Sequence, residues 1–163
     1  MVMTGWQVAR RGFTLIELLI VLLIISIIAV IAIPNLLEAR KNGNEVSAIG
    51  AMKTIANAEI MYQQHDNEQN GQFDYGNLQQ LSNTTLIDPT LAAAKHGYRF
   101  DAGASSFTPD YLWFATANPV VPWSTGDRYF CTNFRGQILY TIRRSIAVDT
   151  VGCSSPSDML PVR

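Results

Sequence analysis

The stretch RRGFTLIELLIVLLIISIIAVIAIP, residues 10–34, decides how this chain folds. It opens with two arginines and continues as an almost unbroken apolar run over residues 13–33. The polar members of this run are Thr14, Glu17 and Ser26. As a helix the run would span roughly 31 Å, about the hydrocarbon thickness of a bilayer. It shows no amphipathic period, and a helix that is apolar all round is buried either in protein or in lipid.

Glu17 is the costly residue of this run. On insertion scales, placing a charged side chain at the centre of a bilayer costs about 2.5–3.5 kcal/mol, and the cost is somewhat lower toward an interface. An ionisable residue inside such a segment is a functional hypothesis by default, and it needs a partner.

Three interpretations of the run compete. A secretory signal peptide has an apolar core of about 7–15 residues and a cleavage site of small residues after it. This run is longer, and Ala32-Ile33-Pro34-Asn35 is not such a site. A plain membrane anchor fits the length but leaves Glu17 unexplained. Cleavage between Gly12 and Phe13 would instead remove a short basic leader and create a new amine four residues from Glu17.

The residues Arg11-Gly12-Phe13-Thr14-Leu15-Ile16-Glu17 closely resemble the processing motif of type IV pilins and type II secretion pseudopilins. In that family a membrane prepilin peptidase cuts after the glycine on the cytoplasmic side and methylates the new N-terminal phenylalanine. The resemblance implies that Gly12 ends the leader, that Phe13 is methylated and that Glu17 is the fifth mature residue. Pro34 falls where the family often has a helix-kinking proline.

The charges near the cleavage site agree with this resemblance. Arg10 and Arg11 favour a cytoplasmic location for the N-terminal side. Methylation preserves the charge of an amine, so Phe13 would remain a cation. Glu17 can accept from the amine of its own helix or from that of a neighbouring subunit. The resemblance implies the second arrangement, in which Glu17 draws an incoming subunit into register.

A second helical segment follows Pro34. Five apolar residues recur there at three- and four-residue spacing: Val46, Ile49, Met52, Ala56 and Ile60. This stripe predicts an amphipathic helix that packs on the chain's own sheet, with the charged residues mostly off the stripe. We expect the helix to end at residues 64–66, because a polar stretch closing at Gly71 signals a stop. Pro34 either kinks one long helix or separates two, since proline costs about 3 kcal/mol in a helix interior.

The C-terminal half predicts a small antiparallel sheet. A short helical turn is expected around Asn77–Leu81. Aromatic and β-branched residues bounded by turn formers predict strands at Tyr98–Asp101, Tyr111–Ala117, Arg128–Thr132 and Gln137–Ile142. Residues 133–136, Asn-Phe-Arg-Gly, predict a hairpin turn that joins the last two strands.

The predicted fold class is therefore α+β: a long N-terminal helix packed on a small antiparallel head, similar in layout to pilin and pseudopilin heads. We divide the chain into a leader (1–12), a transmembrane or filament-core helix (13–34), its amphipathic continuation (35–68) and a globular head (69–163). The upper helix has no sheet to pack against. Outside a bilayer it can be buried only against copies of itself, which predicts polymerisation.

The rest of the sequence offers little chemistry. His65 and His96 are isolated from other metal ligands, so a zinc site is not predicted. The chain has no nucleophile–base constellation and no glycine-rich phosphate loop, so we expect no enzyme. The formal net charge is -1 and only Arg143-Arg144 is locally basic in the second half, which argues against a nucleic-acid partner.

The oxygen-rich stretch Trp123-Ser124-Thr125-Gly126-Asp127 lies where secretion pseudopilins often bind calcium. It departs too far from that pattern for ligands to be assigned. We interpret it as a solvated turn and expect no cofactor.

Both cysteines, Cys131 and Cys153, lie in the C-terminal half. They can pair if this half is exported and should stay reduced if it is cytosolic. Many pilins close their C-terminal region with such a bridge, so the resemblance implies a Cys131–Cys153 disulfide. A loop of this length would contribute about 3 kcal/mol in the chain-entropy picture.

The leading functional prediction is a structural subunit of a type IV pilus. It starts as a single-pass inner-membrane precursor with a cytoplasmic N-terminus and becomes part of a periplasmic or extracellular filament. Its expected partners are identical or homologous pilins, prepilin peptidase and the inner-membrane assembly machinery. Two alternatives stay open: a type II secretion pseudopilin in a short periplasmic filament, and an anchored protein whose head binds a ligand or catalyses. A bridged tail would favour the pilus, and a strictly calcium-held head would favour the pseudopilin.

Overall fold

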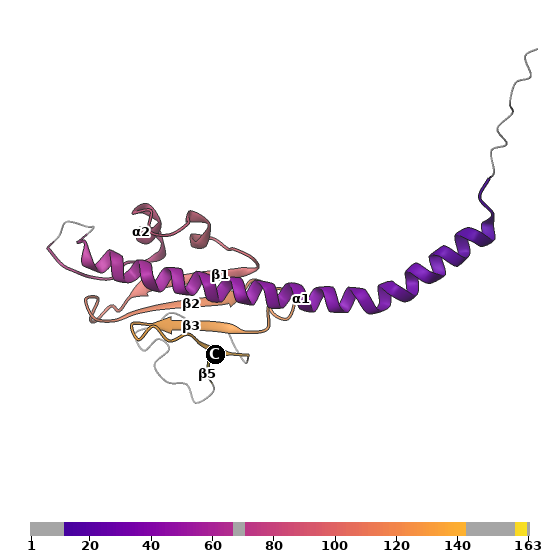
Figure 1. The fold of residues 1–163 in the computed structure, drawn as a ribbon. Coiled ribbons are helices and arrows are strands. Elements are labelled where there is room, and N and C mark those ends of the chain that lie inside the picture. The colour runs from indigo at the N-terminus through magenta and orange to yellow at the C-terminus, as the bar shows by residue number, and fades with distance from the viewer. Residues whose placement is uncertain (1–11, 67–70, 143–158, 163) are drawn as a thin grey trace, which may run out of the picture. The chain divides into compact units, whose positions relative to one another are not determined.

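The structure is a computed structural model, and it describes residues 12–66, 71–142 and 159–162. The chain divides into two compact units, Met1–Leu37 and Glu38–Arg163. Figure 1 labels the helices and strands. The helices are α1 (Leu15–Gln64), α2 (Leu78–Asn83) and the 3-10 helix η1 (Pro89–Ala92). The strands are β1 (Tyr98–Ala104), β2 (Trp113–Pro119), β3 (Tyr129–Asn133), β4 (Leu139–Thr141) and β5 (Leu160–Pro161).

α1 is one helix that contains Pro34 in its interior, so the alternative of two separate helices is wrong. Ser26, a polar residue in the apolar run, donates its hydroxyl to the carbonyl of Leu22 at 2.7 Å, which satisfies it within the helix. The helix ends at Gln64, within the predicted range, and Asp66 just beyond it adopts a positive φ of 41°.

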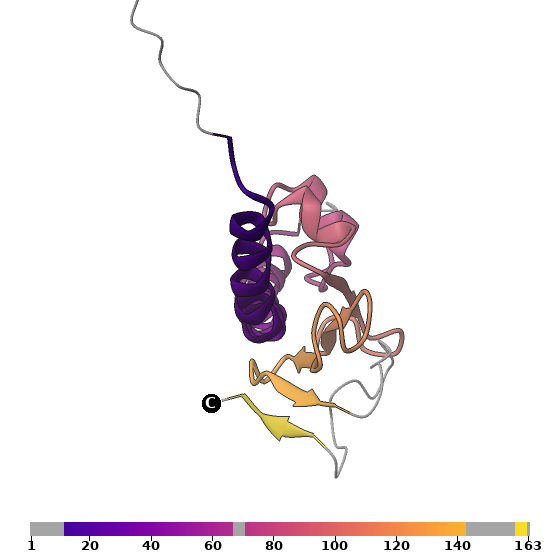
Figure 2. The ribbon, with the colours of Figure 1, turned by 90° about the vertical axis from the view of Figure 1, so that its right-hand side faces the viewer.

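The strands form a five-stranded sheet in the order β1-β2-β3-β4-β5, and every neighbouring pair is antiparallel. All four predicted strands are present with shifted ends, and this α+β architecture confirms the predicted fold class. The predicted hairpin turn is confirmed as well: the N–H of Gly136 donates to the carbonyl of Asn133 at 2.8 Å, and Gly136 has a φ of 70°. Figure 2 shows β5, in yellow, at the outer edge of the sheet. This strand was not predicted, because two residues carry no alternation.

The helix face that is buried in the head overlaps the predicted stripe only in part. Of the predicted stripe only Met52 is buried, whereas Val46 and Ile60 are 67% and 47% exposed. Ile49 and Ala56 lie half-buried at the edge of the core. The buried face consists of Glu45, Ala48, Met52, Ile55, Ala58, Glu59 and Tyr62. The prediction was only partly right, because the buried face carries two glutamates and two small alanines and therefore has the weaker apolar signal.

The core of the head lies between this face of α1 and the sheet. Met52 and Ile55 belong to the same buried cluster as Tyr98, Trp113 and Phe130 of the first three strands. Short helices extend the cluster with Leu78, Leu81 and Leu91. Trp113 also meets the ring of Tyr75, with centroids 6.2 Å apart.

The two buried glutamates have opposite environments. Oε1 of Glu45 accepts from the backbone N–H groups of Asp127 and Arg128 at 2.8 and 3.1 Å, and Oε2 accepts from Nε of Arg128 at 2.5 Å. Glu59 is fully buried and accepts one bond, from the N–H of Gly76 at 3.0 Å. Its Oε1 has no hydrogen-bond partner among the described residues. Burial raises the pKa of Glu59 to about 8, against the weaker opposing effect of the Gly76 bond.

Glu59 should therefore make the stability of the head depend on pH. Because its pKa in the folded chain lies above the ordinary value of 4.5, the folded state holds the proton more tightly than the unfolded state. The free energy of unfolding then decreases as pH rises from about 4.5 to 8. Glu59→Gln should remove this decrease, a difference of roughly 3–5 kcal/mol between pH 5 and pH 9.

Denaturant unfolding of the detergent-solubilised chain, followed by tryptophan fluorescence at the two pH values, measures this effect. Asp101→Asn, which changes an exposed carboxylate of β1, serves as the matched control and should keep the parent's pH dependence. The account of Glu59 is wrong if Glu59→Gln and the parent chain lose the same stability between pH 5 and pH 9.

Candidate functional site

The residues of the predicted processing site lie just before α1. Gly12 and Phe13 have no regular secondary structure, and both are exposed, Phe13 to 84%. Nothing in the described part of the chain covers the peptide bond between them. A protease that needs an extended substrate can therefore reach this bond without unfolding the helix.

Thr14 and Glu17 close the N-terminus of α1 with reciprocal hydrogen bonds. Oε2 of Glu17 accepts from the backbone N–H and the hydroxyl of Thr14, at 2.9 and 2.7 Å. The N–H of Glu17 donates back to the hydroxyl of Thr14 at 3.3 Å. This is a capping box, which satisfies helix N–H groups that have no partner in the preceding turn. The sequence analysis missed Thr14, although threonine three residues before a glutamate and ahead of an apolar run signals this motif.

The capping box sets the position of the Glu17 carboxylate. Thr14, whose N–H it accepts, directly follows Phe13, so the carboxylate lies beside the residue whose amine cleavage would expose. Both bonds from Thr14 go to Oε2, and Oε1 receives none within the described residues. Glu17 therefore keeps an acceptor oxygen for a further donor.

Behind Glu17, the large apolar side chains of the first unit are exposed, from 46% at Val21 to 75% at Val30. Among the described residues, α1 is the helix that is long and apolar enough to cross a membrane. Removing apolar surface of this extent from water lowers the free energy of the system. Lipid or other protein chains must therefore cover these side chains.

In the head, ion pairs hold the β2–β3 loop (residues 120–128) on α1. Nζ of Lys41 lies 2.8 Å from Asp127 and 2.9 Å from Glu38. The hydrogen bonds to these two carboxylates, first that to Asp127, raise the pKa of Lys41 to about 12. Asn44 donates to the carbonyl of Thr125 at 2.9 Å. Asp127 is thus a half-buried partner of Lys41, whereas Trp123 and Ser124 at the start of the same turn are exposed, so the interpretation as a solvated turn holds for its first residues only.

Comparison with known proteins decides the family. The family described as the prokaryotic N-terminal methylation motif matches residues 8–33. Over 109 residues the chain is 37% identical to the type IV wide pilus major component PilA4 of Thermus thermophilus, covering 64% of this chain and 79% of that relative. This chain belongs to the type IV pilin family. No solved structure is significantly similar to it.

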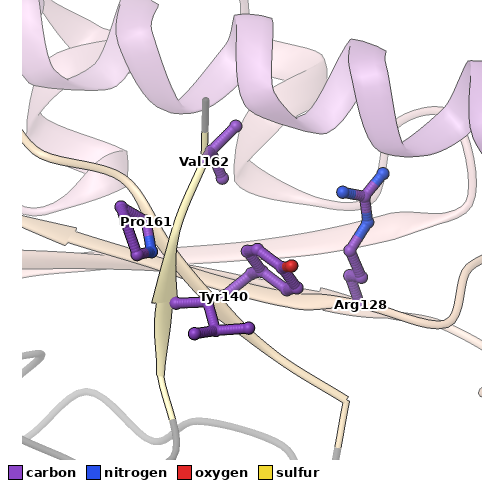
Figure 3. A pocket seen from close by; sticks show the side chains of 5 residues that line it. Arg128, Tyr140, Pro161 and Val162 are labelled. Carbon is purple, nitrogen blue, oxygen red and sulfur yellow. The ribbon is translucent and has the colours of Figure 1, made fainter.

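A pocket of about 400 Å³ in this pilin is lined by the edge strands, as Figure 3 shows. The guanidinium of Arg128 lies 5.3 Å from the ring centroid of Tyr140, and Leu160, Pro161 and Val162 complete the lining. Arg128 is already paired with Glu45. The charge of Arg128 is therefore already balanced by Glu45, and we assign no ligand to this pocket.

The predicted disulfide of the pilin concerns β3 and the C-terminal tail. Cys131 is fully buried in β3. Cys153 lies outside the described residues, as do Arg143 and Arg144, so the Cys131–Cys153 bridge stays a prediction.

Thiol counting tests the bridge. The purified, unreduced pilin should show no reactive thiol in denaturant, because both cysteines would be paired, and two after reduction. Labelling with a maleimide reagent and intact-mass analysis provide the count. Two reactive thiols before reduction would rule the bridge out.

Proposed function

We propose that this pilin is cleaved between Gly12 and Phe13 by prepilin peptidase, methylated on Phe13 and polymerised as a structural subunit of a type IV pilus. The match to the methylation motif over residues 8–33 supports the processing. The exposed, non-helical backbone at Gly12 and Phe13 supports access for the peptidase. In this proposal the pilin is not an enzyme and requires no cofactor.

The observation that carries the proposal is the position of Glu17. Its carboxylate is held by Thr14 beside the future N-terminus, through Oε2. Cleavage adds a cationic amine at Phe13, and methylation leaves that charge in place. The remaining acceptor capacity of Glu17 then fits the amine of an adjacent subunit, and the pairing offsets the cost of a carboxylate in an apolar environment.

The same residues support the location of the pilin before assembly. Arg10 and Arg11 favour a cytoplasmic N-terminus, and the apolar part of α1 crosses the inner membrane once. The assembly machinery then transfers this helix from lipid to a core of identical or homologous pilins in a periplasmic or extracellular filament. Pro34 lies at the end of the apolar run, where its missing N–H weakens the helix and would ease this transfer.

Two observations support a pilus over a secretion pseudopilin. The relative from Thermus thermophilus is the major component of a pilus. The loop in which pseudopilins often hold calcium is held here by Lys41, which pairs with Asp127, and by Arg128, which pairs with Glu45. A cation supplied by the chain leaves little need for a metal at the same place.

Exchange of Glu17 for glutamine tests the role of its charge. Glutamine also closes capping boxes, so Glu17→Gln keeps the helix terminus and removes only the charge. We expect normal membrane insertion and a loss of roughly tenfold or more in surface filaments, because the neutral amide no longer attracts the cationic amine of the next subunit. Immunoblots of sheared filaments and of membranes measure both quantities.

Ser26→Ala is the matched control. It removes another polar side chain of the apolar run, one whose hydroxyl bonds only to its own helix, so filament yield should stay near that of the parent. If Glu17→Gln forms filaments at the parent's yield, Glu17 does not act through its charge. An equal loss of filaments in Ser26→Ala would show that any polar change in the apolar run impairs assembly, and the charge of Glu17 would then have no special role.

A further inference from the structure

The β2–β3 loop displays an apolar tip. Val120, Val121 and Trp123 are 44%, 51% and 66% exposed, and we call these residues with Pro122 the tryptophan tip. Trp123 has a φ of 66°, a conformation that bulky residues rarely adopt and that persists only where surrounding bonds enforce it. Its N–H donates to the carbonyl of Gly126 at 3.0 Å.

The tryptophan tip is held rigidly. The hydroxyl and N–H of Thr125 both donate to the carbonyl of Val121, at 3.1 and 2.9 Å. A Cβ at Gly126 would overlap the hydroxyl of Tyr98, so this glycine lets the loop lie directly on the sheet. Together with the bonds to Lys41 and Asn44, these contacts fix the tip before any partner arrives, which lowers the entropic cost of binding.

A shallow groove of about 480 Å³ lies at the other end of the head. Phe73 and Tyr111 line it and are 56% and 74% exposed, and Pro109 and Asp110 also line it. Backbone contacts hold it in place: the N–H of Tyr75 donates to the carbonyl of Pro109 at 3.1 Å. This groove, called the aromatic groove below, falls within the range of volumes typical of binding pockets.

The two surfaces face opposite ends of the head. The loop that contains Pro109 and Asp110 precedes β2, and the tryptophan tip follows it (Figure 1), so a strand of roughly 20 Å separates them. On α1, Asn44 contacts the loop of the tip, whereas Gln63 donates to the carbonyl of Asp110 at 3.4 Å. One molecule therefore cannot bring its own tip to its own groove.

We propose that the tryptophan tip of one pilin inserts into the aromatic groove of the next. The ring of Trp123 would pack on Phe73 and Tyr111, and its indole N–H would donate to the carboxylate of Asp110. A contact between two different surfaces of identical subunits does not close on itself and generates an open filament. This inference rests on the proposed polymerisation and names the surfaces in the heads that join.

Disulfide or bismaleimide cross-linking of the full-length chain in filaments tests the contact. Trp123→Cys combined with Tyr111→Cys should produce a ladder of covalent multimers in denaturing gels. Trp123→Cys combined with Asp101→Cys, a pair whose second position lies on the exposed side of β1, should give no more multimers than the parent. Equal cross-linking of the two pairs in assembled filaments would overturn the contact and leave the proposed function standing.

A second set of variants applies if the cysteine pairs assemble poorly. Trp123→Phe keeps an aromatic ring for the groove and should retain most filaments, whereas Trp123→Ala should lose at least tenfold. Phe134→Ala removes another exposed aromatic side chain, 45% exposed, from a turn outside both surfaces and should have little effect. Parent-like yield of Trp123→Ala would contradict the inference. Absence of the parent chain itself from any filament would contradict the proposed function as well.

Discussion

The structure depends on an apolar helix segment whose side chains are exposed. Over residues 15–37 nearly every side chain is exposed, and surface of this kind contributes about 25 cal/mol for each Å² removed from water. The segment therefore needs lipid first and other subunits later. In the proposed assembly Glu17 makes this transfer specific, because a capped carboxylate at one fixed place accepts a partner in one register only.

In the head, the buried face of α1 carries two glutamates, and their environments are opposite. Glu45 is neutralised by Arg128 and by two backbone N–H groups, so its burial fixes the β2–β3 loop. Glu59 has one N–H donor and a raised pKa, so it stays buried most easily as a neutral acid. The first glutamate fixes the loop that carries the tryptophan tip, and the second is expected to set the pH range in which the head is most stable.

Much of this could be predicted from sequence, because the decisive signals were local. The apolar run and its cleavage motif, the hairpin turn at Gly136 and the end of α1 follow from residues that act on their neighbours. The buried face of α1 could not be predicted, since Glu45 is buried only because Arg128, far along the chain, neutralises it. The pairing of Lys41 with Asp127 and the positive φ of Trp123 also depend on tertiary contacts, which periodicity does not report.

The central claim is that cleavage after Gly12 creates the amine at Phe13 with which Glu17 of an adjacent subunit pairs. Intact-mass and N-terminal mass spectrometry of sheared filaments test it most directly. The account predicts a chain that begins with N-methylated Phe13 and lacks residues 1–12. A mature chain in filaments that still begins at Met1, or that begins at any residue other than Phe13, would contradict it.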